Sequence, residues 1–164
     1  MALTAVNLGT VYKENLDNCL VAGLLHDYSK CVPIDNLIPE CEKYGVELSD
    51  EDKMADGCIH GFLAAKVCKE KFNINDEVYN AIYYHTCGRE DMTMLEKIIY
   101  IADFISDERD YPGVDEVREA AFRDINEAVL IGTRFTLEDL LRQGRVINQD
   151  TIDAYNEVCK YFNY

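Results

Sequence analysis

Residues 93–105 read TMLEKIIYIADFI, an almost unbroken apolar stretch that contains one aspartate near its end. Thr93 and Glu96 form a T-x-x-E capping box, which predicts a helix that begins at this point. Asp103 lies inside that apolar helix, where a carboxylate is costly unless a cation pairs with it. The cation could be an arginine or lysine from a neighbouring helix, or it could be a metal ion.

Helical periodicity continues on both sides of this segment, and no pair of segments alternates convincingly enough to predict strands. The 164 residues carry no Gly/Ser-rich linker and no internal repeat, so we expect an all-α fold, with residues 1–164 forming one domain. The other expected helices are Ala2–Tyr12, Leu16–Tyr28, Ile34–Tyr44, Ala55–Phe72, one capped by Asn75 that runs through Tyr84, amphipathic segments at Val114–Leu130 and Leu137–Leu141, and one that opens at Asn148 or Asp150 and runs through Phe162.

Composition restricts the partners. Apolar residues make up 48% of the chain, which predicts a folded globule rather than disorder. The net charge of −15 would repel nucleic acid and anionic membranes, so we expect neither as a partner. It would also repel a nucleotide, unless a local cation such as a metal cluster offsets it.

The cysteines favour a reducing environment. There are seven, at positions 19, 31, 41, 58, 68, 87 and 159, and no two of them form a C-x-x-C pair. An odd, widely spaced set predicts free thiols and a cytoplasmic protein, rather than a disulfide framework or a zinc ribbon. The N-terminus has no basic segment followed by a long apolar core, so we expect no signal peptide.

Only three histidines occur, and each lies among apolar or small residues. His26 follows VAGLL, His60 lies within CIHGFLAA, and His85 follows AIYY. Any one of them alone is more typical of a hydrogen-bonded core histidine than of a ligand. Three together, with Asp27 and Asp103 in similar settings, predict a nitrogen and oxygen ligand set of the kind that suits iron, manganese, zinc or nickel.

The order HD…H…H…D resembles that of the HD-domain metal-dependent phosphohydrolases. The similarity is greater to one branch, the YqeK-type symmetrical bis(5'-nucleosyl)-tetraphosphatases. The segments that carry it are AGLLHDYSK at 22–30, HG at 60–61, AIYYHTCGREDMTMLEKIIYIADFISDERDYPGVDEVREAAF at 81–122 and TIDAYNE at 151–157. The resemblance therefore extends over nearly the whole chain.

This resemblance implies an HD-type helical bundle with a two-metal site. Iron is the expected metal, and manganese, cobalt, nickel or zinc are the alternatives. Asp27 would bridge the two ions, with His26 and Asp103 on one ion and His60 and His85 on the other. A hydroxide bridging the ions would attack a phosphorus atom of diadenosine tetraphosphate and give two molecules of ADP. Two neighbouring cations can supply this chemistry.

The sequence departs from the family pattern at its beginning. Family members carry a further histidine in the first helix, but residues 1–25 contain none. Alignment of the helix before the HD pair places that ligand a few residues upstream of Met1. We therefore expect either that the first helix is truncated in this sequence or that one metal has lost a ligand and binds weakly.

Four cations and one hydroxyl are candidates for contact with phosphate. Lys30 and Arg89 are expected to take part in catalysis as well as in binding, although Lys30 could instead interact with a helix dipole. Thr86 could bind a phosphate or cap a turn. Arg109 and Arg118 could bind phosphate or pair with the many nearby acids. The aromatic residues in these segments, which are Tyr83, Tyr84, Tyr100 and Phe104, are expected in the core.

Two alternatives to the tetraphosphatase remain. One is an HD phosphohydrolase that acts on a nucleoside mono-, di- or triphosphate. The other is a degenerate HD domain that binds a nucleotide without turnover. The resemblance also leaves room for a homodimer.

Overall fold

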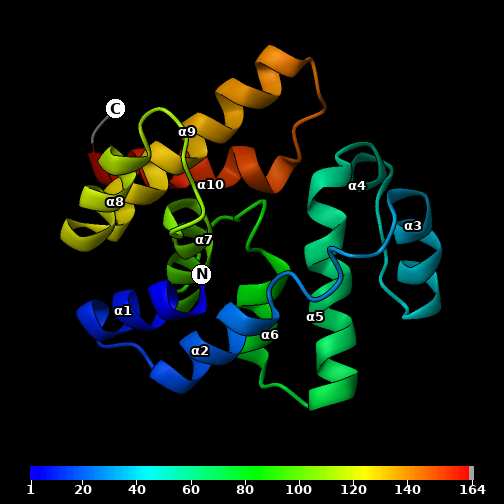
Figure 1. The fold of residues 1–164 in the computed structure, drawn as a ribbon. Coiled ribbons are helices and arrows are strands. Elements are labelled where there is room, and N and C mark those ends of the chain that lie inside the picture. Colours follow the sequence, from blue (N-terminus) through cyan, green and yellow to red (C-terminus); the bar gives the residue numbers. More distant parts are fainter. Residues whose placement is uncertain (163–164) are drawn as a thin grey trace.

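The computed structural model describes residues 1–162, and within that range all regular structure is helical (Figure 1). This confirms the expected all-α fold. The helices are α1 (Ala2–Tyr12), α2 (Leu16–Leu25), α3 (Ile34–Lys43), α4 (Asp50–Met54), α5 (Ile59–Phe72), α6 (Asp76–Tyr83), α7 (Met94–Ile105), α8 (Val114–Arg123), α9 (Ile125–Gln143) and α10 (Gln149–Cys159), with 3₁₀ turns at Asp56–Cys58 and Lys160–Phe162.

Helix α7 lies at the centre of the bundle (Figure 1). It packs against α1, α2, α6, α8 and α9. The Thr93 side chain accepts a hydrogen bond from the backbone N–H of Glu96, and the Glu96 side chain accepts one from the backbone N–H of Thr93, so the predicted capping box is present. Most residues of α7 are buried. An apolar helix of this kind is stable only when other elements cover it on several sides.

Around α7, one main hydrophobic core contains residues from Ala5 on α1 to Val158 on α10. A smaller cluster beneath α3 joins Leu37 and Cys41 to the outer face of α5. Tyr100 is fully buried in the main core, as expected, whereas Phe104 is only partly buried.

The structure shortens three predicted helices: Leu16–Tyr28 ends at Leu25, Ala55–Phe72 begins at Ile59, and the last helix ends at Cys159. Two further predictions differ in how the helices are divided. Val114–Leu130 is two helices, because Asp124 adopts an extended conformation and its side chain caps the backbone N–H of Asn126. The segment Leu137–Leu141 is the last part of α9 rather than a separate helix. Helix α4 was not predicted, since its five residues are nearly all charged and show no apolar period.

Among the described residues, no helix is long and apolar enough to cross a bilayer. All seven cysteines are free thiols, as the sequence predicted.

Candidate metal centre

Four separate segments deliver the predicted ligands to one place. His26 is the C-cap of α2, and Asp27 opens the turn that follows it. His60 lies in the first turn of α5, and His85 lies in the loop after α6. Asp103 is on the last turns of α7. Because the ends of α2 and α6 and the start of α5 meet beside α7, residues up to 77 positions apart in the chain become neighbours.

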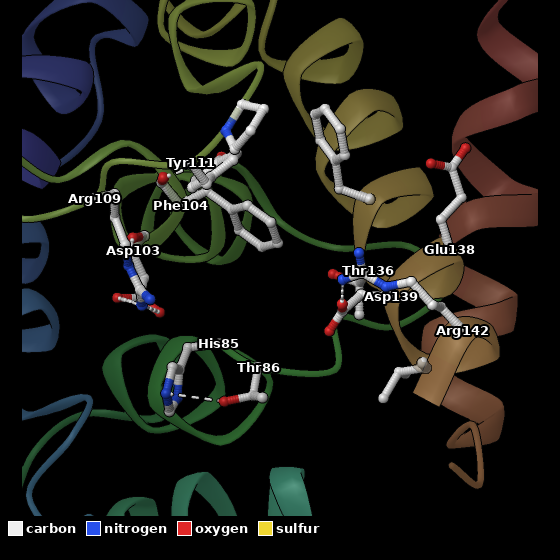
Figure 2. A pocket seen from close by; sticks show the side chains of 13 residues that line it. His85, Thr86, Asp103, Phe104, Arg109, Tyr111, Thr136, Glu138, Asp139 and Arg142 are labelled. Carbon is white, nitrogen blue, oxygen red and sulfur yellow. Dashed lines mark hydrogen bonds and ion pairs between the residues drawn. The ribbon is translucent and has the colours of Figure 1, made fainter. Parts of the chain in front are cut away.

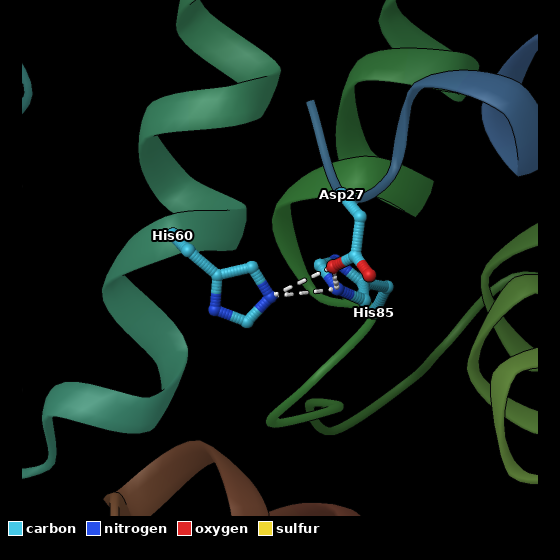
Figure 3. Close-up of side chains that lie close together, drawn as sticks. All are labelled: Asp27, His60 and His85. Atoms are coloured by element: carbon cyan, nitrogen blue, oxygen red, sulfur yellow. Dashed lines mark hydrogen bonds and ion pairs between the residues drawn. The ribbon is translucent and has the colours of Figure 1, made fainter. Parts of the chain in front are cut away.

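Asp27, His60 and His85 form the tightest group (Figure 3). Their ligand atoms all lie within 4.8 Å of one another. Asp27 Oδ1 is 3.2 Å from His60 Nε2 and 3.6 Å from His85 Nε2, and these two nitrogens are 3.1 Å apart. Figure 3 shows the two imidazoles and the carboxylate converging on a common point.

The hydrogen bonds on the far side of two rings select their tautomers. His85 Nδ1 donates to the carbonyl of Ile82 at 2.7 Å, and His26 Nδ1 donates to the carbonyl of Gly23 at 3.0 Å. Each ring therefore turns an Nε2 lone pair towards Asp27, which is how a metal-binding histidine is usually oriented. Burial lowers the pKa of His85 and so favours the neutral, ligating form of its ring.

These contacts fit a cation better than they fit a network of hydrogen bonds. The neutral ring of His85 has its one proton on Nδ1, so its Nε2 has none to give to Asp27. Asp27 Oδ1 is buried, and within residues 1–162 it has no hydrogen-bond partner. A buried oxygen without a partner is costly, and a bound cation would remove that cost. The donor set of imidazole nitrogen and carboxylate oxygen is the one that first-row transition metals prefer.

Asp27 remains ionised in this setting. Burial alone would raise its pKa, but hydrogen bonding to the charged form, including that from the ammonium of Lys30, outweighs burial and holds the pKa well below its usual range. A carboxylate that stays charged at neutral pH is available to two cations at once, one on each oxygen.

The second oxygen of Asp27 faces a different group of side chains. Asp27 Oδ2 is 3.4 Å from His26 Nε2 and 2.8 Å from Lys30 Nζ. His26 Nε2 is in turn 3.9 Å from Asp103 Oδ1. Asp103 also binds Arg109, whose Nη2 donates to both carboxylate oxygens at 2.7 and 2.8 Å. The geometry thus divides the five predicted ligands into two sets that share Asp27.

Gly61 allows this close packing of α5 against the loop after α6. A Cβ atom at Gly61 would lie 3.1 Å from ring atoms of His85 and 3.1 Å from the carbonyl oxygen of Tyr83. The HG pair at 60–61 therefore serves both segments, since one residue supplies an imidazole and the other leaves space for its neighbour's ring.

The remaining predicted side chains differ in their distance from the cluster. Thr86 Oγ1 is 3.0 Å from His85 Nε2, and Lys30 contacts Asp27, so both lie at the centre. Arg89 instead donates two hydrogen bonds of 3.0 Å to Glu96, whose side chain is 1% exposed. The roles of Thr86, Lys30 and Arg89 in substrate binding or catalysis stay predictions.

Arg118 binds the backbone of the α7–α8 loop. Its guanidinium donates to the carbonyls of Ile105, Ser106 and Arg109, and it also pairs with Asp115. This places Arg118 directly behind the loop that carries Arg109. A contact between Arg118 and phosphate stays a prediction, and its present contacts hold Arg109 in place.

A cavity of about 640 Å³ adjoins the cluster (Figure 2). His85, Thr86, Asp103 and Arg109 line one end of it. Its other walls come from the α7–α8 loop and from α9, including Tyr111, Phe135 and Glu138, none of which the sequence singled out. No local motif marks these residues, because only the tertiary fold brings the two elements together.

The first helix was expected to lack a ligand. The described residues of α1 offer no imidazole, carboxylate or thiol. Its N-terminal end lies near the site, because a Cβ atom on Gly23 would come within 2.9 Å of the Ala2 Cα, one turn before His26. A ligand upstream of Met1 stays a prediction.

Comparison with known proteins gives concordant matches. The HD domain family model matches residues 1–106. A symmetrical bis(5'-nucleosyl)-tetraphosphatase of Bacillus subtilis is 34% identical over 156 residues, which cover 93% of this chain and 82% of that protein. A protein of the same name from Staphylococcus aureus is 33% identical over an alignment of 169 positions, which covers 100% of this chain and 84% of that protein.

A solved structure shares the fold. A crystal structure from Clostridium acetobutylicum, described as a predicted HD superfamily hydrolase involved in NAD metabolism, superimposes with a TM-score of 0.93 at 38% identity. The match covers 98% of this chain and 85% of the other.

Proposed function

The chain belongs to the HD-domain family, in the branch of the symmetrical bis(5'-nucleosyl)-tetraphosphatases, and from this premise we propose that it hydrolyses diadenosine tetraphosphate to two molecules of ADP. The observation that carries the proposal is the convergence of Asp27, His60 and His85 around a buried carboxylate oxygen without a partner. A metal-dependent hydrolase requires such a ligand set, and a degenerate domain would have no reason to keep it.

The cluster would hold two divalent transition ions. His60 and His85 face one oxygen of Asp27 and His26 faces the other, with Asp103 beside it. When bound, such ions supply Lewis acidity towards phosphate oxygens and a nucleophile from water at neutral pH. Iron is the proposed metal, and manganese, cobalt, nickel and zinc suit the same donors.

The protein's own side chains would bind and orient the tetraphosphate. Arg109 lies at the cavity wall and, with 43% of its side chain exposed, can reach a phosphate while it stays paired with Asp103. Lys30 is 56% exposed and can turn from Asp27 towards the substrate. Thr86 offers a hydroxyl at the same end of the cavity. These positive groups would offset the charge of −15, which otherwise repels a polyphosphate.

The cellular setting is part of the proposal. Seven free thiols are typical of a reducing compartment, which supports a cytoplasmic location. The acidic surface supports a small-molecule nucleotide as the partner, rather than nucleic acid. A homodimer is compatible with the fold.

The experiment is product analysis. Purified protein loaded with Fe²⁺, Mn²⁺ or Co²⁺ is given diadenosine tetraphosphate, and the nucleotides are separated by ion-exchange chromatography. ADP as the only product supports symmetrical cleavage. ATP plus AMP would contradict it, and turnover of mono-, di- or triphosphates alone would favour the other HD phosphohydrolase. His60→Ala is the control, since it removes a ligand and should abolish turnover.

A further inference from the structure

Helices α1 and α2 form a hairpin at the edge of the bundle, and its outer side carries exposed leucines (Figure 1). On α2, Leu16, Leu20 and Leu24 recur every four residues, and all three are exposed, Leu24 by 65%. On α1, Leu3 is 77% exposed. Residues four apart lie on one side of a helix, so the three leucines of α2 form a stripe. These four leucines are the hairpin face.

Close packing of the two helices makes the hairpin face continuous. A Cβ atom on Gly23 would lie 2.9 Å from the Cα of Ala2, so the start of α1 lies directly against the last turns of α2. Leu3 and Leu24 follow these two residues in the chain and therefore lie at the same end of the hairpin. Exposed apolar side chains that gather on one surface usually mark a contact with another molecule.

The surroundings of this face carry unusually little charge. Helix α1 reads ALTAVNLGTVY and has no charged side chain, although the whole chain has a net charge of −15. The hydroxyl of Thr10, which is exposed on α1, donates to the carbonyl of Val6 at 3.0 Å and so already has a partner within the helix. A second acidic protein would meet less repulsion here than on a face that carries the net charge.

The few charges beside the face are complementary to themselves. Lys13 is the C-cap of α1, and Asp17 lies in the first turn of α2, so both are at the closed end of the hairpin. Both are exposed, and within residues 1–162 neither makes an ion pair. In a two-fold dimer the same patch of each copy contacts the other. With the two closed ends together, Lys13 of each copy would face Asp17 of the second copy.

We propose that the hairpin face binds a second copy of this chain, in a two-fold dimer in which α1 and α2 of one copy pack against α1 and α2 of the other. A second copy brings the same apolar face without charge and the matching pair of turn charges. The dimer would bury four leucines from each copy, and burial of apolar surface is the main driving force of such association. The contact does not involve the metal ligands, so it is independent of the proposed function.

The test is sedimentation equilibrium of the whole chain over a wide range of protein concentration, where a reversible monomer–dimer equilibrium is expected. Leu24→Glu should raise the Kd of the dimer at least about tenfold, because each copy loses one buried leucine. Leu141→Glu is the matched control, since Leu141 is a leucine of similar exposure, 68%, on α9. Circular dichroism checks that each variant folds, and Leu20→Glu replaces Leu24→Glu if that variant does not.

The turn charges test the orientation of the two copies. Lys13→Glu or Asp17→Lys alone should raise the Kd of the dimer at least about twofold, because two exposed ion pairs are lost. The double variant, which exchanges the two charges, should recover the original Kd. A double variant that dimerises no better than the single variants would overturn the proposed arrangement.

Three results would overturn the dimer itself. One is a chain that sediments as a monomer at every concentration. Another is an equal rise in Kd for Leu24→Glu and Leu141→Glu, because the effect would then come from added negative charge alone. The third is a monomer that floats with phosphatidylcholine vesicles and stops doing so in Leu24→Glu, because the hairpin face would then bind lipid.

Discussion

The ion pair between Arg89 and Glu96 can decide what Arg89 does. Glu96 is 1% exposed and Arg89 is 29% exposed, so removal of the arginine leaves a desolvated carboxylate whose other bond comes from the backbone N–H of Thr93. Breaking a buried pair costs about 3–5 kcal/mol. Because Arg89 is partly exposed, the loss of stability expected for Arg89→Met lies near the lower end of that range, at about 3 kcal/mol. That is a fall in Tm of roughly 6–12 °C for a chain of this size.

The double variant Arg89→Met with Glu96→Gln should recover much of that loss. It removes both charges, while the glutamine oxygen can still accept from Thr93. Unfolding is followed in urea by circular dichroism, and Arg123→Met is the control, since the pair of Arg123 with Glu127 is exposed and should contribute little.

Turnover of the double variant then separates the two roles. If Arg89 only supports α7, the double variant keeps its kcat/KM; if Arg89 contacts phosphate, as the sequence predicted, kcat/KM falls although the fold is restored. A loss of under 1 kcal/mol in Arg89→Met, or a double variant no more stable than the single one, would refute the electrostatic reasoning.

Three further outcomes follow from the site. Asp103→Asn should lower metal content and turnover together without loss of helicity, as measured by elemental analysis and circular dichroism; full activity would remove Asp103 from the site. Chelation by EDTA should lower the Tm of the metal-loaded protein, because a ligand at about 100 times its Kd stabilises by about 2.7 kcal/mol, whereas an Asp27→Asn protein should not respond. Gly113→Ala should cost about 1–3 kcal/mol and weaken ADP binding, because its positive φ and its contact with Phe135 both oppose a side chain. Gly45→Ala is the control, because Gly45 also has a positive φ but a Cβ atom there would have no neighbour within 4 Å. An equal loss of stability in the two variants would show that the contact with Phe135 is unimportant.

Local signals were enough to locate several helices. The capping box at Thr93 and the cap at Asn75 both appear in the structure, and α1 has the predicted bounds Ala2–Tyr12. Each of these depends on contacts within a few residues, which a sequence displays directly. The break at Asp124 was missed because the apolar period continues across it, while the backbone leaves the helix for one residue.

In the site, too, some features could be predicted from the sequence and others could not. Asp27, His60 and His85 could be selected because a charged or ligating residue in an apolar segment is unusual wherever it occurs. The partners of Arg89, Arg109 and Arg118 could not be predicted from the sequence. In such an acidic chain, almost any fold would place some carboxylate within reach of each guanidinium. Their contacts with Glu96, with Asp103 and with loop carbonyls depend on how α7 meets its neighbours.

The most direct test of the central claim is the position of metal in crystals of this protein grown with Fe²⁺ or Mn²⁺. Anomalous difference maps should show an ion about 2.0–2.4 Å from Asp27 Oδ1, His60 Nε2 and His85 Nε2. A second ion should lie on the side of Asp27 that faces His26 and Asp103. Well-ordered side chains with no anomalous peak among them, or a peak bound elsewhere, would contradict the account.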